Sequence, residues 1–306
     1  MTKEMKNMEK KKIAHKRIQK NDSKFTSFFI YFVVIFAALI TVYPFYYVVI
    51  NSFSDPYEVL RRNVWFLPIR PTAMAFEELM KESEVFVAYG NTLWYTVVGT
   101  VLNVLVTILA AYALSIRNFC LRKPISLFVV ITMFVSGGII PLYIVVCKTG
   151  LYNTRWSLVI PTLVSAYNLI IARAYMESIP VELAESGKLD GANDFVIFWR
   201  IIVPVAKPII ALLAIYYAVG HWNEYFNPMI YLSDRELKPV QLYLRELLIT
   251  DTNGATQQAA TGNQKTVLYE ELKFANIVFT VLPITIIYPF FQKYFVQGVM
   301  IGAVKG

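Results

Sequence analysis

The sequence is poor in the residues that metal sites, disulfide frameworks and soluble surfaces require. It has two cysteines and two histidines among 306 residues, so we expect neither a His/Cys metal site nor a disulfide framework. Charged residues make up 16% of the chain, against about 25% in a typical soluble domain. Hydrophobic residues make up 57%, which indicates a membrane protein.

Familiar catalytic motifs are also missing from the sequence. The chain has no Gly-x-x-x-x-Gly-Lys-Ser/Thr sequence, the motif with which many ATPases bind phosphates. It shows no nucleophile and base in an arrangement of the hydrolytic type. We therefore expect the chain to have no catalytic residue and to bind no metal or cofactor of its own.

Long apolar runs occupy most of the chain. A bilayer core needs about 20 apolar residues per helical span. Backbone polar groups in lipid must be paired within the segment, so we expect each run to be a helix. The predicted fold is an all-α membrane protein with six transmembrane helices. These are expected at residues 28–50, 91–116, 125–147, 158–176, 204–221 and 274–291.

The positive charge is concentrated at one end of the chain. Of the 29 Lys and Arg residues, nine precede Phe25, and the net charge is +8. A basic tail before a first apolar run is typical of topology control, so we expect no nucleic-acid partner. With the N-terminus inside, the inner segments hold 18 basic residues and the outer segments 11. Both termini of this multi-pass protein are then expected to be cytoplasmic.

The same pattern divides the chain into four parts. Residues 1–27 form a basic cytoplasmic tail, and residues 28–90 hold the first span and an outer loop. Residues 91–292 form a core of five helices with a cytoplasmic loop at 178–208, and residues 293–306 form a cytoplasmic tail. The outer segment 222–273 contains a low-complexity stretch, Asp251 to Gln264, which we expect to be mobile.

The cytoplasmic loop 178–208 predicts two short helices joined by a sharp turn. Ser178 is a candidate N-cap, and Glu182 lies where a carboxylate favours the helix dipole. The Asp190-Gly191 pair is typical of a turn, and Asn193 or Asp194 can cap the second helix. A rigid surface helix can fit a groove in a partner. The second helix is expected to bury an apolar face of Phe195, Phe198, Trp199 and Ile202.

This loop resembles the EAA signature of permease subunits in ATP-binding-cassette (ABC) importers. Glu185-Ser186-Gly187 stands for the E-A-A triplet, Gly191 for the central glycine, and Ile201 to Pro204 for the closing run. Ser186 and Gly187 depart from the two alanines, and Gly187 is expected to weaken the helix by about 1 kcal/mol relative to alanine.

Three further segments resemble the carbohydrate-uptake branch of these permeases, a MetI-like, MalG-related group of the LplC/YtcP type. They are Phe134 to Pro141, Gly150 to Trp156 and Tyr294 to Gly306. The resemblance implies a type I importer in a bacterial cell membrane. Its implied partners are a second permease subunit in a heterodimer, an ATPase dimer that holds ATP and Mg²⁺, an extracytoplasmic sugar-binding protein, and membrane lipid.

The resemblance also implies that the loop docks in a cleft of the ATPase and transmits its closure to the spans. The expected docking residues are Glu182, Glu185, Ser186, Gly187, Asp190, Gly191, Ala192 and Pro204.

Polar side chains within the apolar runs are candidates for a substrate path. Such groups are costly in lipid and tend to face a bundle interior or a cavity, although hydrogen bonding between helices explains them equally well. Trp222, Asn223 and Glu224 lie at the outer end of the fifth span, and the alternative explanation for them is that they cap that span. The candidates are Asn91, Asn103, Asn168, Asn276, Trp222, Asn223 and Glu224.

A stand-alone secondary transporter is the alternative function. Such transporters bind their substrate at mid-membrane between inverted repeats. The sequence shows no convincing repeat and no mid-span carboxylate for ion coupling, which favours the ATP-driven importer.

Overall fold

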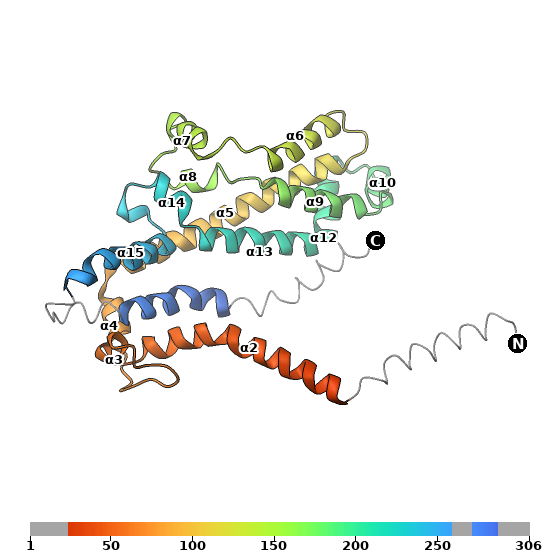
Figure 1. Ribbon diagram of the computed structural model, residues 1–306. Coiled ribbons are helices and arrows are strands. Elements are labelled where there is room, and N and C mark those ends of the chain that lie inside the picture. Colours follow the sequence, from red (N-terminus) through yellow and green to blue (C-terminus); the bar gives the residue numbers. More distant parts are fainter. Residues whose placement is uncertain (1–23, 259–270, 287–306) are drawn as a thin grey trace, which may run out of the picture.

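The computed structural model describes residues 24–258 and 271–286, and within these ranges it is built of helices and connecting turns (Figure 1). Two helices, α2 (Lys24–Ser52) and α5 (Ser83–Ser115), are long and apolar enough to cross a membrane. Residues 271–286 form a further helix. The remaining elements are α3 (Pro56–Leu60), α4 (Met74–Lys81), α6 (Arg122–Phe134), α7 (Ile139–Lys148), α8 (Trp156–Val159), α9 (Ala166–Ser178), α10 (Glu182–Leu189), α11 (Asp194–Val196), the π-helix η1 (Ile197–Ile202), α12 (Val203–Val205), α13 (Lys207–Asn223), α14 (Phe226–Tyr231), the 3₁₀-helix η2 (Arg235–Leu237) and α15 (Val240–Gln258).

The expected six unbroken spans are not confirmed in the part of the chain that the structure describes. Two bent helix pairs, α6 with α7 and Asp194–Val205 with α13, each pass the length and hydropathy test for a span only when taken together. They raise the number of candidate spans from two to at most four. The sixth expected span, 274–291, lies partly outside the described residues.

The third expected span is broken because its sequence contains Ser136-Gly137-Gly138. Helix α6 ends at Phe134, and α7 begins at Ile139 after a bend of 120°. Gly138 has φ +84°, a backbone conformation that glycine adopts without steric penalty. Its N–H donates to the Ser136 hydroxyl at 3.2 Å. Local turn chemistry therefore overrides the continuous apolar pattern.

The fourth expected span, 158–176, is also interrupted. Helix α8 ends at Val159, and α9 begins at Ala166 after a non-helical segment that contains Pro161. The Ser165 hydroxyl caps α9 by accepting from the Asn168 N–H at 3.4 Å. The helix that follows has 13 residues, fewer than a bilayer core of about 20 residues requires.

The segment 222–273 is not a plain loop, because α14, η2 and α15 lie within it. Helix α15 continues to Gln258, so the first half of the low-complexity stretch is helical, and its expected mobility stays a prediction. The rest of that stretch, and most of both terminal tails, lie outside the described residues. Helix α5, which contains the second expected span, begins at Ser83.

Helix α5 is the centre of the bundle, and α9 and α13 pack along it (Figure 1). One apolar cluster joins α5, α9, η1 and α13, with Ala111, Ala172, Ile197 and Leu213 fully buried. A hydrogen bond lies within this cluster, between the Thr107 and Tyr217 hydroxyls, which are 2.8 Å apart. These contacts make α5, α9 and α13 the frame on which the neighbouring loops rest.

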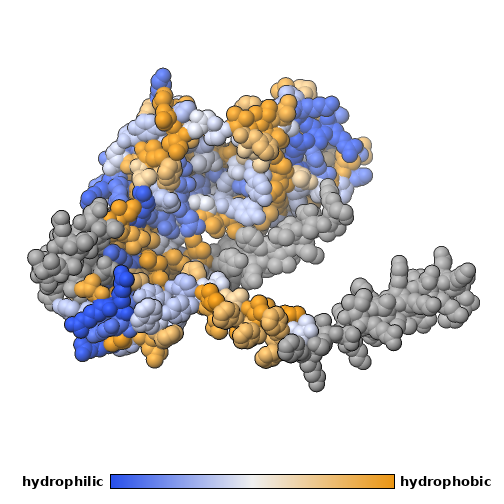
Figure 2. Space-filling view, in the orientation of Figure 1, coloured by the Kyte–Doolittle hydropathy of each residue, from blue (hydrophilic) through white to orange (hydrophobic). Residues whose placement is uncertain are grey.

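Helix α2 packs only near its C-terminal end. Its membrane-length segment, Thr26–Ser52, has a mean hydropathy of 2.4 and no buried share in its most apolar window. Near its end, Asn51 and Ser52 are buried, and the Tyr47 ring contacts Phe274 edge-on at 6.0 Å. Figure 2 shows the apolar surface of α2 running clear of the bundle, as expected for a helix that faces lipid or another subunit.

Candidate docking loop and membrane path

Helix α10 of the cytoplasmic loop starts later than the sequence suggests. Ser178 is not its N-cap but the last residue of α9, and its hydroxyl donates to the Tyr175 carbonyl at 2.6 Å. The N–H groups of Leu183 and Ala184 bond to the carbonyls of Pro180 and Val181, which open the helix. The Ser178 prediction fails because α9 continues to that residue, whereas the position of Glu182 in the first turn is confirmed.

The predicted turn after α10 is confirmed. Gly191 has φ +79°, a conformation that favours glycine over any residue with a Cβ. The Ala192 N–H returns to the Gly187 carbonyl at 2.9 Å, which satisfies an otherwise free carbonyl at the helix end. Asn193 is the cap of the next helix, because its side-chain oxygen accepts from the Val196 N–H at 2.8 Å.

Gly187 seats α10 on the π-helix η1. A Cβ at this position would lie 2.8 Å from Ile201 Cδ1 and 3.1 Å from Ile197 Cγ1. Both distances are too short for an ordinary contact, so glycine permits the close approach of the two helices. Glycine in place of alanine at position 187, expected to weaken the helix, therefore allows α10 to pack closely against η1.

The buried face of the second helix differs from the prediction. Phe198 and Ile202 are buried as expected, but Phe195 is 70% exposed and Trp199 38% exposed. Ile197 is fully buried and faces Gly187. The π-helical turn from Ile197 to Ile202 widens the spacing of hydrogen bonds from four residues to five. The face predicted from α-helical spacing is rotated as a result.

Helix α10 presents a surface that is acidic and apolar at once. Leu189 is 90% exposed and Val181 59% exposed, beside the carboxylates of the first turn. Large exposed apolar side chains next to charges are typical of a binding surface. Among the eight expected docking residues, Glu182, Glu185, Ser186, Asp190, Gly191 and Pro204 are exposed, Ala192 is half-buried and Gly187 is buried.

Asn91, a candidate for the substrate path, forms hydrogen bonds to the loop that contains Glu236 and Lys238. Its amide donates to the carbonyls of Glu236 and Lys238 at 2.6 and 3.2 Å. Its oxygen accepts from Arg155 at 3.0 Å, and the Arg155 guanidinium lies 5.3 Å from the Trp94 ring centre. These contacts support the alternative explanation, in which the buried amide holds neighbouring elements together.

The other amides in the bundle are only partly satisfied. Asn103 donates to the Thr162 carbonyl at 3.0 Å, while its buried oxygen has no partner among the described residues. Asn276 accepts from the Thr280 hydroxyl at 3.4 Å, and its buried amide nitrogen is unpaired within the same ranges. Asn168 is buried in the core of α9.

The cluster at the end of α13 anchors neighbouring elements. Trp222 is buried, and its indole donates to the Thr280 carbonyl at 3.3 Å, which brings it to the same helix as Asn276. The Glu224 carboxylate accepts the N–H groups that open α14, from Phe226 at 3.2 Å and from Asn227 at 3.1 Å. The candidate Asn223 is exposed, and its amide donates to the Val219 carbonyl at 3.0 Å.

Helix α5 carries a polar stripe of which the sequence predicted one member, Asn103, but not the other two, Thr96 and Thr100. The hydroxyls of Thr96 and Thr100 and the oxygen of Asn103 are buried without a partner in the described part of the chain. Their spacing of four and three residues places them on one face of the helix. His221 Nε2 on α13 is also buried and unpaired there, beside Gly99. The four-and-three spacing of polar residues in an apolar run is the signal that sequence analysis could have used.

Asn153 is a second residue that the sequence did not reveal, and it joins two loops. Its oxygen accepts from the N–H groups of Ser233 and Asp234 at 2.9 and 3.0 Å, and its amide donates to the Asp234 carboxylate at 2.9 Å. Its own N–H donates to the Tyr231 carbonyl at 2.8 Å. It has φ +57°, which asparagine tolerates better than most residues.

Replacing Asn153 by alanine is therefore expected to destabilise the protein by about 2 kcal/mol, from lost hydrogen bonds and backbone strain. Thermal unfolding in detergent measures the change. Asn153→Gly removes the same side-chain bonds without the strain, so it should unfold between alanine and wild type. An alanine variant as stable as wild type would contradict this role.

The arrangement defines a class of membrane protein. A bundle of apolar helices carries a rigid, exposed helical loop at one end and buried polar side chains inside. Buried polar side chains inside such a bundle are typical of a membrane protein that lets a polar solute pass between its helices.

Comparison with known proteins identifies the family. Residues 103–301 match the model of the family described as binding-protein-dependent transport system inner membrane component. The chain belongs to this family and is a permease subunit of an ABC importer.

Two relatives from Bacillus subtilis (strain 168) resemble nearly the whole chain. Protein LplC is 38% identical over 271 residues, which cover 87% of this chain and 90% of LplC. The polygalacturonan/rhamnogalacturonan transport system permease protein YtcP is 35% identical over 277 residues, covering 90% and 97%.

A solved structure has the same fold. A chain of a bacterial ABC transporter involved in the import of the acidic polysaccharide alginate matches with a TM-score of 0.81 and 31% identity. The match covers 89% of this chain and 98% of that one. The all-α permease fold and the resemblance to ABC importer permeases are thereby confirmed.

Proposed function

We propose that this chain imports a saccharide and is driven through α10 by a separate ATPase. The observation that carries the proposal is the seating of α10. Its buried Gly187 fits closely against Ile197 and Ile201, while its acidic first turn and Leu189 are exposed. A force applied to α10 is therefore passed to η1 and, through the shared apolar cluster, to α5, α9 and α13.

The proposed assembly has four kinds of partner besides lipid. An ATPase dimer binds ATP and Mg²⁺ and takes α10 in a cleft, so this chain itself binds no cofactor and catalyses no reaction. A second permease subunit forms a heterodimer with this one, and an extracytoplasmic binding protein delivers the solute. The positive N-terminal tail supports a topology with both termini in the cytoplasm.

The relatives and the buried polar groups support a saccharide as the solute. The names of similar proteins refer to polygalacturonan/rhamnogalacturonan, arabinooligosaccharides and an alginate importer. The unpaired oxygens of Thr96, Thr100 and Asn103 on one face of α5 offer acceptors that sugar hydroxyls can use. Asn168 and Asn276 remain proposed path residues because they are buried polar side chains in the bundle. The contacts of Asn91, Trp222, Asn223 and Glu224 support an anchoring role for these four candidates.

The docking residue Glu185 provides the test. We expect Glu185→Lys to reverse the charge of the exposed α10 surface and to lower ATPase recovery when the tagged chain is purified from its own membranes. ATP-dependent uptake into vesicles from the same cells should fall by about tenfold, because a like-charge contact costs on the order of 1 kcal/mol or more. Glu77→Lys is the matched control, since Glu77 lies in the exposed first turn of α4.

The same experiment separates the proposal from a secondary transporter. Uptake that persists without ATP, with no ATPase recovered from wild-type membranes, would favour the secondary transporter. Equal uptake by the Glu185→Lys and Glu77→Lys variants would reject α10 as the docking helix.

A further inference from the structure

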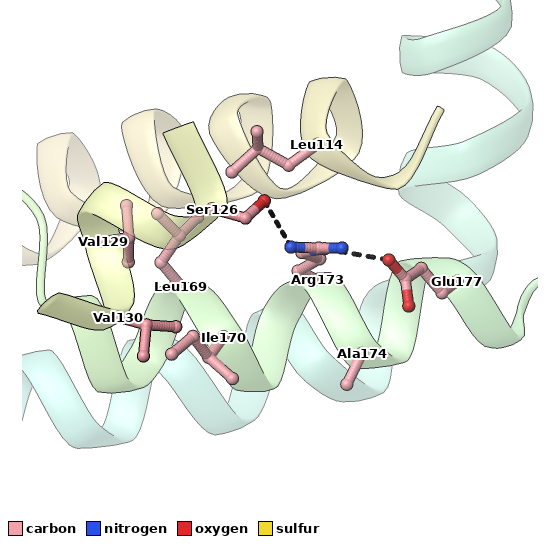
Figure 3. Close-up of a pocket in the computed structure, with 9 residues that line it drawn as sticks. All are labelled: Leu114, Ser126, Val129, Val130, Leu169, Ile170, Arg173, Ala174 and Glu177. Atoms are coloured by element: carbon pink, nitrogen blue, oxygen red, sulfur yellow. Dashed lines mark hydrogen bonds and ion pairs between the residues drawn. The ribbon is translucent and has the colours of Figure 1, made fainter. Parts of the chain in front are cut away.

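An amphipathic cleft lies between α5, α6 and α9, away from the polar stripe. The cleft has a volume of about 190 Å³, and the large apolar side chains that line it are Leu114, Val129, Val130, Leu169 and Ile170. Figure 3 shows Val129, Val130, Leu169 and Ile170 on one side, and Arg173 between Ser126 and Glu177 on the other, with Leu114 above Arg173. The cleft thus has an apolar part and a polar mouth.

A second cavity of about 520 Å³ lies beside the polar mouth. The two cavities share Ser126 and Arg173 in their linings, so they are neighbours on the same surface. The second cavity is lined by Arg117, Arg122 and Lys123 as well as Arg173. Four cations therefore line a space that lies beside an apolar groove.

Glu177 leaves most of this positive charge unbalanced. Its carboxylate accepts from Arg122 at 2.6 Å and from Arg173 at 2.8 Å, and Arg173 also donates to the Ser126 hydroxyl. The remaining cations, Arg117 and Lys123, form no ion pair among the described residues. The Arg122 Nε atom is buried and lacks an acceptor within those residues. The side chains that line the two cavities therefore carry an excess of three positive charges.

The cleft lies at the same end of the bundle as α10. Glu177 is next to the last residue of α9, and α10 begins at Glu182. Under the proposed topology this end faces the cytoplasm, at the depth where lipid headgroups meet acyl chains. Basic pockets between helices on that side are suited to anionic lipid headgroups.

We propose that the cleft binds one anionic phospholipid. The phosphate lies among Arg117, Arg122 and Lys123, the basic side chains that line the second cavity. An acyl chain fills the groove beside Leu169 and Ile170. A free phosphate ion would leave the apolar groove empty, and an acidic protein surface has no acyl chain to insert into it. A phospholipid fills both the basic cavity and the apolar groove.

Lipid binding to the purified full-length chain in detergent tests this site. Phosphatidylglycerol and phosphatidylcholine are added separately, and bound lipid is counted by native mass spectrometry. We expect one phosphatidylglycerol to bind about tenfold or more tightly than phosphatidylcholine, because several basic side chains act on one headgroup. Inorganic phosphate should compete weakly, since it lacks the acyl contacts.

Three variants locate the site. Arg122→Gln with Lys123→Gln should weaken phosphatidylglycerol binding by about tenfold or more. Arg61→Gln with Arg62→Gln, an exposed pair directly after α3, removes the same charge and should leave binding unchanged. Ala174→Trp fills the groove that Ala174 lines and should weaken binding without changing the charge.

The proposal is overturned by any of three outcomes. These are equal binding of both lipids, full competition by inorganic phosphate, and loss of ATPase recovery in the Arg122 and Lys123 variant with lipid binding intact. The binding measurements use neither ATP nor a sugar, so they are independent of the proposed transport function.

Discussion

Replacing Gly187 by valine is expected to uncouple ATP hydrolysis from transport while the chain still enters the membrane. A Cβ at this position already lies 2.8 Å from Ile201 Cδ1 and 3.1 Å from Ile197 Cγ1. A branched side chain adds two methyl groups to that contact, and overpacking of this kind typically costs about 1–3 kcal/mol. Helix α10 is short and has few other contacts, so it should move away from η1 before the bundle unfolds.

Two further variants test whether the clash at residue 187 is the cause. Gly187→Ala should have a smaller effect, because the ends of the two isoleucine side chains can shift by a few tenths of an ångström. Adding Ile201→Ala to Gly187→Val should restore coupling by opening space at the closer contact. The measurements are ATP-dependent uptake into vesicles and the yield of the protein in membranes. Full uptake by the valine variant would show that the seating of α10 does not matter.

The second large effect is expected at Gly99, where α5 and α13 meet. A Cβ there would lie 2.7 Å from Cε1 and 2.8 Å from Cδ2 of His221, and α13 and α5 form the most extensive helix contact described. Gly99→Val should therefore separate the two helices and destabilise the protein by about 3 kcal/mol. Thermal unfolding in detergent measures the loss.

Gly90 supplies a matched control on the same helix. A Cβ at Gly90 has no neighbour within 4 Å, so Gly90→Val tests the effect of a β-branched residue in α5 alone. Adding His221→Ala to Gly99→Val should recover much of the lost stability, because it removes the ring that clashes. If both valine variants unfold at the same temperature, the Gly99 contact with His221 is not limiting.

Local rules were enough to predict the parts of the docking loop that depend on neighbouring residues. The turn at Gly191 and a cap at Asn193 or Asp194 follow from backbone freedom and from a short polar side chain, which are visible in the sequence. The structure selects Asn193. The family and its membrane character were also predictable, because several motifs and long apolar runs lie far apart in the chain.

The remaining features depend on contacts between distant segments. The need for glycine at position 187 arises from its close contact with Ile201. The rotated buried face of the second helix arises from a π-helical turn that residue preferences do not specify. The positive φ of Asn153 is stabilised by residues about eighty positions away. The broken third span was foreseeable, since Ser136-Gly137-Gly138 is visible within it, but an apolar run of the right length outweighed that signal.

The break between α6 and α7 has a consequence for how the subunit is assembled. Residues 131–145 are exposed in the isolated chain, and the peptide groups between Phe134 and Ile139 are outside any helix. Uncovered peptide groups are poorly tolerated in hydrocarbon, where each costs several kcal/mol. In the proposed heterodimer the second permease subunit would have to cover these groups, so a copy without that partner would leave them exposed to hydrocarbon.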